Sequence, residues 1–318
     1  MYVQAKESRD YLMLEMELAA EYAPQNIYVY ILDRKSPLLF HNQMKALADC
    51  FPNVFVLTKT YDMSSWGKNM NYALMSSLEF LARSRFSWKY VIFLQNHDVI
   101  LRTNYELVQI FKLFNGTNDI EVNPAWPWLM ERIDPHLDWT YAGLNLFKNE
   151  SRNSHKKINF SKGYAVGSLS RAMVEFMLNE LNLTKFLAQL ENGMYAVDEQ
   201  LLSTLQADDE IQTPGGFTQK CNDDGYGTDC ITRVAFWSYD QECLSGIHRH
   251  SVCIMGMEDL AYLNHLPHLT INKFIPSTDF GALICWYEHL FNRTYFEPPK
   301  ELDMNFYANL NHELLFVF

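Results

Sequence analysis

The sequence predicts an α/β fold with a mostly parallel central sheet and helices on both of its faces. Three short runs, residues 27–32, 54–57 and 90–94, are rich in β-branched and aromatic residues, as strands are. The segments between them carry apolar residues at helical spacing, so strands and helices alternate along the chain. This alternation is typical of a parallel sheet, because each strand is connected to the next through a helix.

The first run is preceded by a predicted helix and followed by an acidic side chain. Residues 14–21 are apolar at helical spacing, and Pro24 begins the turn that leads into the strand. Asp33 follows the strand directly, at the edge where open α/β sheets bind their ligands, so it is a candidate contact for the base or ribose of a nucleotide. A helix or turn cap is an equally good interpretation of Asp33.

Composition limits the class of protein. With 318 residues, 48% of them hydrophobic, the chain can bury the core of one large domain or of two closely packed ones. Its formal net charge of −12 argues against nucleic acid as a partner, because phosphate binding needs a basic surface. Six cysteines and several Asn-x-Ser/Thr sites for N-glycosylation favour the lumen of the secretory pathway. These sites are Asn115, Asn149, Asn159, Asn182 and Asn292.

The third run leads to the position where a metal-dependent enzyme that uses nucleotide sugars carries an Asp-x-Asp motif for Mn²⁺ or Mg²⁺. Only Asp98 stands there, beside His97. One carboxylate is a poor chelator for a hard cation, so we expect no metal and expect side chains to neutralise a bound diphosphate. A minor metal site at His97 and Asp98 is the alternative.

Residues 119–159 show neither helical nor strand periodicity, yet they are rich in aromatic side chains. We expect this segment to be the main saccharide-binding loop, since sugars stack on aromatic faces. The aromatic residues concerned are Trp126, Trp128, Trp139 and Tyr141. Farther along, residues 170–181 predict an amphipathic helix that begins at a serine cap.

Two carboxylates are predicted at the start of a helix. Asp198 is expected at the cap and Glu199 in the first turn, where the positive end of the helix favours their ionised forms. An ionised glutamate can take a proton from a sugar hydroxyl within hydrogen-bonding reach, so Glu199 is a candidate general base. The alternative is a pair of helix-start acids without a catalytic role, and the pattern alone favours that alternative.

Residues 233–239 predict a strand that carries two aromatic side chains. A two-residue step places Trp237 and Tyr239 on the same face of it. The pair can form a platform for a sugar or can simply cover the core.

A short cysteine loop near the end of the chain is a candidate site for an anionic leaving group. Cys243 and Cys253 can form a disulfide in an oxidising compartment, and Lys273 follows a β-like apolar run. The basic side chains inside the loop are His248, Arg249 and His250. Cations fixed next to a diphosphate stabilise it far more than mobile ones do. A surface loop with solvated basic side chains is an equally good interpretation.

Several segments together carry a resemblance to a known family. Residues 243–256, 272–274 and 279–290 look like the C-terminal signature of the Core 2/I-branching β-1,6-N-acetylglucosaminyltransferases. Shorter matches upstream occur in the family's order, and these are residues 23–26, 33–35, 50–56, 88–90, 102–104 and 198–199. The resemblance covers the chain from about residue 14 to about residue 293.

The resemblance implies a GT-A-like nucleotide-sugar fold, with a first strand that is reduced here to residues 2–4. It implies an inverting, metal-independent transfer of N-acetylglucosamine from UDP-N-acetylglucosamine (UDP-GlcNAc) to a hydroxyl of a glycan. The product would be a β-1,6 branch on an acceptor of the O-glycan type. No cofactor is implied besides this donor, and the partners are a nucleotide sugar and a glycan or glycoprotein.

The family's roles transfer to matching positions of this sequence. The resemblance makes Glu199 the general base and places Trp237, Tyr239 and Glu121 at the acceptor. The segment from residue 160 resembles a Phe-Ser-Gly-Ser-Ala motif, from which Lys162 departs.

The resemblance also implies two cations at the diphosphate. Lys273 matches the family lysine, whereas His250 stands at the position of the family arginine, one residue after Arg249. Either Arg249 takes that role, or a protonated His250 does, which would make activity weaker or more dependent on pH.

We expect one catalytic domain over residues 1–318, with a nucleotide-binding half (1–118), an acceptor and catalytic half (119–293) and a tail (294–318). The family resembles type II membrane proteins of the Golgi. No apolar run here approaches the roughly 20 residues of a membrane span, so the anchor is expected to be missing and the N-terminus shortened. The alternatives to an active transferase are a lumenal protein that binds UDP or glycans without turnover, and a relative that transfers xylose.

Overall fold

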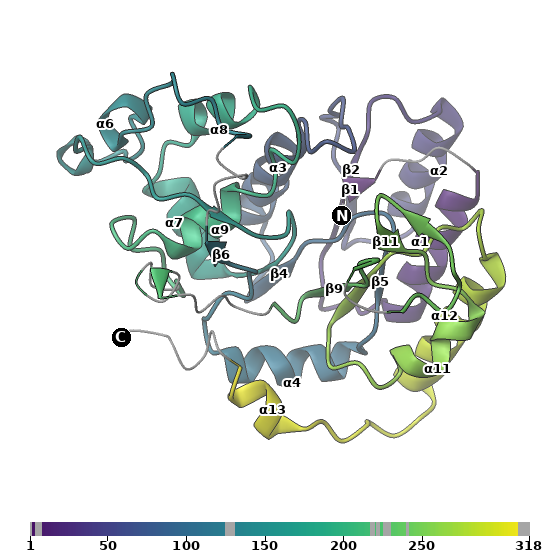
Figure 1. Ribbon diagram of the computed structural model, residues 1–318. Coiled ribbons are helices and arrows are strands. Elements are labelled where there is room, and N and C mark those ends of the chain that lie inside the picture. Colours follow the sequence, from purple (N-terminus) through teal and green to yellow (C-terminus); the bar gives the residue numbers. More distant parts are fainter. Residues whose placement is uncertain are drawn as a thin grey trace. The chain divides into compact units, whose positions relative to one another are not determined.

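The chain, shown as a computed structural model in Figure 1, divides into two compact units. The structure describes residues 2–3, 8–124, 131–216, 220, 223–224, 230–239 and 242–310. The first unit consists of Met1–Thr58, Leu94–Leu113 and Ile231–Tyr307, and the second of Lys59–Phe93, Phe114–Cys230 and Ala308–Phe318. The expected single domain with halves that meet at residue 118 stays a prediction.

A parallel three-stranded sheet, in the order β1-β2-β3, forms part of the first unit. Its strands and the helices that connect them are β1 (Tyr2–Val3), α1 (Ser8–Glu21), β2 (Tyr28–Leu32), α2 (Leu38–Asp49) and β3 (Val54–Val56). In the register, Tyr2 pairs with Ile31 and Tyr28 pairs with Val54. The first two predicted strands therefore form and pair in parallel, as expected.

The helices α1 and α2 pack on these strands around buried apolar side chains. The core residues are Leu14, Leu18, Tyr30, Leu32, Phe40, Met44, Leu47 and Val54. Leu14 and Leu18 are one helical turn apart, so both face the sheet. The predicted helix at 14–21 is thus the second half of the longer α1.

A second sheet of the first unit has the order β5-β12-β9. Its central strand β12 (Thr270–Asn272) is antiparallel to β5 (Asp98–Ile100) and parallel to β9 (Arg233–Ala235). The strands β10 (His248–Arg249) and β11 (Val252–Cys253) form a separate hairpin. The remaining elements of this part of the chain are α4 (Asn104–Phe114), η2 (Met257–Asp259), α11 (Leu260–Leu263), α12 (Phe280–Tyr295) and α13 (Met304–Ala308).

Short antiparallel strand pairs and helices make up the second unit. β4 (Tyr90–Ile92) pairs with β8 (Ser168–Ser170), and β6 (Asn123–Pro124) pairs with β7 (Ser161–Lys162). The helices are α3 (Met70–Arg83), α6 (Tyr141–Leu144), α7 (Arg171–Asn179), α8 (Thr184–Leu190) and α9 (Leu201–Ala207), with the 3₁₀ turn η1 (Glu150–Arg152). The Ser170 hydroxyl accepts a hydrogen bond from the Met173 amide at 3.3 Å, so the predicted serine cap of α7 is confirmed.

The α/β fold class is confirmed, although the strands are distributed over several small sheets. The third predicted strand forms as β4 but pairs antiparallel with β8, because strand composition does not specify a partner. No helix among the described residues is long and apolar enough to cross a membrane.

Candidate active site

The first unit gathers three cationic side chains around the end of β12. Lys273 follows this strand directly, Arg233 begins β9 and Arg249 ends β10. Burial, together with repulsion from Arg249 and Arg233, lowers the pKa of Lys273 to about 8. Cations close enough to repel one another form a ready site for an anion, since a bound anion relieves that repulsion.

The buried carboxylate of Asp98 holds this cluster together. Its Oδ1 accepts a hydrogen bond from Asn272 Nδ2 at 2.8 Å and lies 3.7 Å from Nη1 of Arg233. Its Oδ2 accepts a hydrogen bond from the backbone amide of Gln95 at 2.7 Å. Both oxygens are thus engaged by protein groups, and the side chain of His97 lies 3.8 Å from a carboxylate oxygen of Asp10 instead. Within the described residues no group of three or more His, Cys, Asp or Glu side chains is arranged to hold a metal ion.

The hairpin β10–β11 decides which basic side chain reaches Lys273. His250 and Ser251 form its two-residue turn, both with left-handed backbone, at φ 53° and 63°. Arg249 pairs with Val252 just before the turn, is half-buried, and is the hairpin residue whose charge acts on Lys273. His250 is exposed in the turn. Of the two expected alternatives, the geometry favours Arg249.

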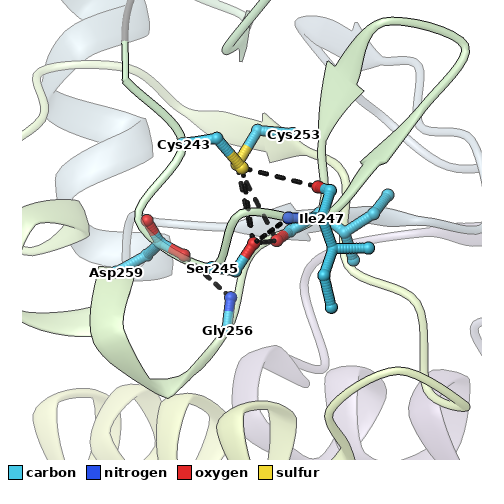
Figure 2. Close-up of a disulfide and its surroundings, with 7 residues drawn as sticks. Cys243, Ser245, Ile247, Cys253, Gly256 and Asp259 are labelled. Atoms are coloured by element: carbon cyan, nitrogen blue, oxygen red, sulfur yellow. Dashed lines mark hydrogen bonds between the residues drawn. A yellow bond between two sulfur atoms is a disulfide. The ribbon is translucent and has the colours of Figure 1, made fainter. Parts of the chain in front are cut away.

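A disulfide fixes the base of this hairpin, as Figure 2 shows. The sulfurs of Cys243 and Cys253 are bonded, with their Cα atoms 5.5 Å apart. Between them, the Ser245 hydroxyl donates to the Ile254 carbonyl at 2.5 Å and accepts from the Ile247 amide at 3.3 Å. The expected disulfide thus forms, and side-chain hydrogen bonds inside the loop restrict the backbone that leads to Arg249.

Trp237 and Tyr239 stack on each other beside the hairpin. Their ring centroids are 5.8 Å apart with an interplanar angle of 16°, and Trp237 forms a β-bridge with Val252. Tyr239 is 74% exposed, so the pair does not serve as core. A half-buried Trp237 ring stacked on an exposed Tyr239 ring suits a saccharide platform, which is the role that the family resemblance implies.

Asp33 lies at the end of β2, and its carboxylate contacts Lys35, two residues farther along the chain. Its Oδ1 accepts from the Lys35 amide at 3.0 Å, and its Oδ2 lies 3.9 Å from the Lys35 ammonium. These contacts are those of a turn cap. The expected role at the nucleoside stays a prediction.

The second unit contains the candidate base in a separate cluster of charges. Oε2 of Glu199 accepts a hydrogen bond from Arg132 Nη1 at 2.9 Å and lies 3.9 Å from Nζ of Lys162. The guanidinium of Arg132 also lies over the ring of Tyr195, 4.3 Å from its centroid. The carboxylate is partly exposed, whereas Arg132 is almost covered, so the pair presents Glu199 to solvent with its orientation fixed.

Glu199 lies before the helix rather than in its first turn. The helix α9 begins at Leu201, and no acidic side chain falls in its first turn, so the predicted cap at Asp198 is wrong. Two features account for this: Ala196 has a left-handed backbone, and the Glu199 carbonyl accepts from the distant Gly163 N at 3.0 Å and from the Ser203 hydroxyl at 3.1 Å. Arg132 and Lys162 place positive charge beside the Glu199 carboxylate.

Gly163 also brings Glu121 into the neighbourhood of Glu199. A Cβ atom on Gly163 would lie 1.9 Å from the carbonyl oxygen of Glu121, so only glycine allows this approach. Because Gly163 donates to the Glu199 carbonyl, Glu121 and Glu199 flank the same glycine. Asp198 instead contacts Gly67, where a Cβ would lie 2.0 Å from Oδ1.

The aromatic side chains of the segment 119–159, which was expected to bind saccharide, are only partly at the surface. Trp139 and Tyr141 are core side chains, so the prediction that they bind saccharide is wrong. The Trp139 ring packs edge-on against Phe160 and Phe186, and the Tyr141 hydroxyl donates to the Asp208 carboxylate at 2.7 Å. Trp126 and Trp128 lie outside the described residues.

The predicted glycosylation sites differ in exposure. Asn115, Asn149 and Asn159 are exposed, whereas Asn182 and Asn292 are half-buried. Their modification stays a prediction.

Arg132 and Arg233 were not predicted from the sequence. Neither stands in a local pattern: Arg132 is 67 residues from Glu199, and Arg233 reaches Asp98 through a sheet whose strand order the sequence does not specify. A pair of positions that change together among relatives would be the only signal for such contacts.

Comparison with known proteins agrees with the resemblance seen in the sequence. The statistical model of the Core-2/I-branching enzyme family matches residues 2–264. A beta-1,3-galactosyl-O-glycosyl-glycoprotein beta-1,6-N-acetylglucosaminyltransferase of Bos taurus is 31% identical over 288 residues, which are 87% of this chain and 66% of the relative. A Homo sapiens relative of that name, numbered 3, is 30% identical over 287 residues, or 87% of this chain and 64% of the relative.

A Danio rerio relative of that name, numbered 4, is 32% identical over 290 residues, or 87% of this chain and 66% of the relative. The chain thus spans slightly less than two thirds of the length of these relatives. The family model accounts for most of the chain, from β1 through α11, including the cysteine loop and Glu199. The chain belongs to the Core-2/I-branching enzyme family.

Proposed function

We propose that this protein is an inverting glycosyltransferase that transfers N-acetylglucosamine from UDP-GlcNAc to a hydroxyl of an O-glycan on a glycoprotein. The observation that carries the proposal is the cationic cluster of Lys273, Arg249 and Arg233. Such a cluster suits the diphosphate of a nucleotide sugar without a divalent ion.

In the proposed reaction, Glu199 takes the proton of the acceptor hydroxyl as the oxygen attacks the anomeric carbon. The new carbon–oxygen bond forms on the face opposite the departing UDP, so the configuration at that carbon inverts. The bond from the anomeric carbon to the phosphate oxygen breaks, and its electron pair leaves with UDP. Lys273 and Arg249 stabilise the charge that develops on the diphosphate, and no metal ion takes part.

Support for the acceptor comes from two sources. The stacked rings of Trp237 and the exposed Tyr239 suit galactose, and the names of the relatives describe action on a beta-1,3-galactosyl-O-glycosyl-glycoprotein. We assign Glu121 a supporting contact with the same acceptor and Asp33 a contact with the nucleoside. The disulfide and the N-glycosylation sites support a location in the Golgi lumen, where such acceptors are modified.

The test is transfer by the purified chain from UDP-GlcNAc to a Galβ1-3GalNAc glycoside in the presence of EDTA. The proposal expects a trisaccharide whose new linkage is β-1,6 by NMR. UDP binding without product would favour the binding protein without turnover, and transfer from UDP-xylose alone would favour the xylose alternative. Neither result is compatible with the proposed activity.

A further inference from the structure

The first unit contains a cavity of about 620 Å³ that shares no lining residue with the proposed donor site. Its walls come from the segment before β2, the start of α4, the residue after α11, the end of α12 and the residues that follow α12. Pockets that bind small ligands occupy about 300–1,000 Å³, so this cavity has the size of a binding site.

Strand directions place the cavity and the donor residues at opposite ends of the strands. The cavity residues Ala23 and Gln25 precede β2, whereas Asp33 follows it, and a strand of this length spans about 16 Å. The antiparallel pairing of β5 with β12 gives the same result. Asn104 of the cavity follows β5 beyond the beginning of β12, whereas Lys273 follows the end of β12.

Two tyrosine rings in the wall are exposed. Tyr105, in the first turn of α4, is 53% exposed, and Tyr295, the last residue of α12, is 44% exposed. The Tyr295 hydroxyl donates to the carbonyl of Tyr22 at 2.9 Å, which fixes the ring in the cavity wall. Exposed ring faces of this kind bind the apolar faces of sugars.

The polar side chains of the wall carry no net charge. The buried guanidinium of Arg293 already has a counter-ion, since its Nη2 lies 2.5 Å from Oε1 of Glu106. Burial and the charge of Arg293 lower the pKa of His289, so this imidazole is neutral at pH 7. The remaining charges, on Glu297 and Lys300, are opposite in sign.

The wall also offers hydrogen-bonding groups. Nε2 of His289 lies 3.3 Å from Oδ1 of Asn264, and the amide nitrogen of Asn264 donates no hydrogen bond to a described residue. A neutral wall with amide and imidazole groups beside aromatic rings suits a ligand that has many hydroxyl groups and no charge.

We propose that this cavity is a second carbohydrate site, which binds an uncharged saccharide separately from donor and acceptor. Such a site would hold a neighbouring glycan chain of a glycoprotein substrate, and it does not depend on transferase activity. An acidic saccharide is not favoured, because Arg293 is already neutralised by Glu106 and the opposite charges of Glu297 and Lys300 leave no net attraction for a carboxylate.

The test is a ligand-observed NMR titration of the full chain, saturated with UDP, with N-acetyllactosamine and with its sialylated form. We expect the neutral saccharide to bind about five-fold more weakly to Tyr105→Ala and with unchanged affinity to Tyr105→Phe, which keeps the ring. Asn264→Ala should weaken binding as well. Tyr239→Ala, which alters the proposed acceptor platform, should leave this binding event intact.

Three results would overturn the proposal: unchanged binding to Tyr105→Ala and Asn264→Ala, loss of all saccharide binding in Tyr239→Ala, or equal affinity for the sialylated form. Failure of the transferase proposal would look different. A protein without turnover would still bind the neutral saccharide, with the same sensitivity to Tyr105→Ala.

Discussion

The guanidinium of Arg132 donates a hydrogen bond to Oε2 of Glu199 at 2.9 Å, across 67 residues of sequence. Arg132 is the more buried partner, and it is also fixed by the ring of Tyr195. The pair therefore fixes one carboxylate oxygen of the proposed base, and no described residue donates a hydrogen bond to the other.

Loss of Arg132 should slow transfer without weakening the binding of UDP. In Arg132→Met the carboxylate of Glu199 loses a charge-assisted hydrogen bond, and we expect kcat to fall about ten- to hundred-fold. UDP affinity, measured by calorimetry, should stay within about two-fold of the wild type because Arg132 is not part of the cationic cluster. Arg171→Met is the matched control, since Arg171 pairs with Glu175 on an exposed helix face. A normal kcat in Arg132→Met would show that Glu199 needs no such orientation.

UDP binding should weaken as the pH rises above about 8. The pKa of Lys273 is lowered to about 8, so the free protein keeps this lysine charged below that pH and loses the charge above it. A diphosphate favours the charged form, so binding above pH 8 must take up a proton, and affinity should fall by up to about ten-fold per pH unit. Calorimetric titrations at pH 7 and 9 measure this change.

Lys273→Met provides the control for that experiment. This variant should bind UDP more weakly at pH 7 and should lack the additional loss at pH 9. If the wild type and Lys273→Met show the same pH dependence, Lys273 does not contact the diphosphate.

Removal of the Cys243–Cys253 disulfide should affect both stability and donor binding. The double change to serine should lower the free energy of unfolding by about 2–4 kcal/mol, because the unfolded chain is no longer restricted. UDP affinity should also fall, since the bridge fixes the hairpin that carries Arg249. Denaturant titration and calorimetry of the double variant test both points. Cys50→Ser, at an exposed thiol, is the control and should change neither quantity.

The buried carboxyl group of Glu17 should make the protein less stable as the pH rises. Neither of its oxygens has a hydrogen-bond partner among the described residues. Burial raises the pKa of Glu17 well above its ordinary value, and burial raises the pKa of its neighbour Glu21 to about 8. The folded protein thus keeps protons that the unfolded chain releases near pH 4.5, so this stability is complete below pH 4.5 and is lost as the pH rises through 8.

Glu17→Gln should therefore raise the free energy of unfolding at pH 8 by about 1–3 kcal/mol and change it little at pH 5. Urea denaturation at the two pH values measures this difference. Glu79→Gln, on an exposed position of α3, should have no effect at either pH. A destabilised Glu17→Gln at pH 8 would mean that the carboxylate has a partner in solution.

The sequence predicted the local features of this protein well. The strands β2 and β3, the serine cap of α7 and the disulfide loop all depend on residues close together in the chain. The predicted helix start near Glu199 was wrong because the Glu199 carbonyl, which a helix would use for its own hydrogen bonds, accepts one from Gly163 N instead. Gly163 is 36 positions away in the sequence. Trp139 was assigned to a surface because its packing partners are distant in sequence, and no periodicity marks them.

The candidate site shows the same difference between local features, which the sequence predicted, and contacts between distant residues, which it did not. Lys273 and Arg249 stand in a recognisable motif, and their coupling in the structure agrees with it. The contacts that organise them, from Asp98 to Asn272 and Arg233, depend on strand order. Strand order is a property of the whole sheet and cannot be read from one strand.

The central claim is that protein cations replace a metal at the departing UDP while Glu199 takes the proton. The most direct measurement is the initial rate of transfer from UDP-GlcNAc in EDTA, for the wild type and Glu199→Gln, with UDP affinity measured on the same preparations. The account predicts a wild-type rate equal to that with Mn²⁺, a loss of at least about 10³-fold in Glu199→Gln, and unchanged UDP affinity. Full turnover by Glu199→Gln, or a wild-type rate that vanishes in EDTA, would contradict it.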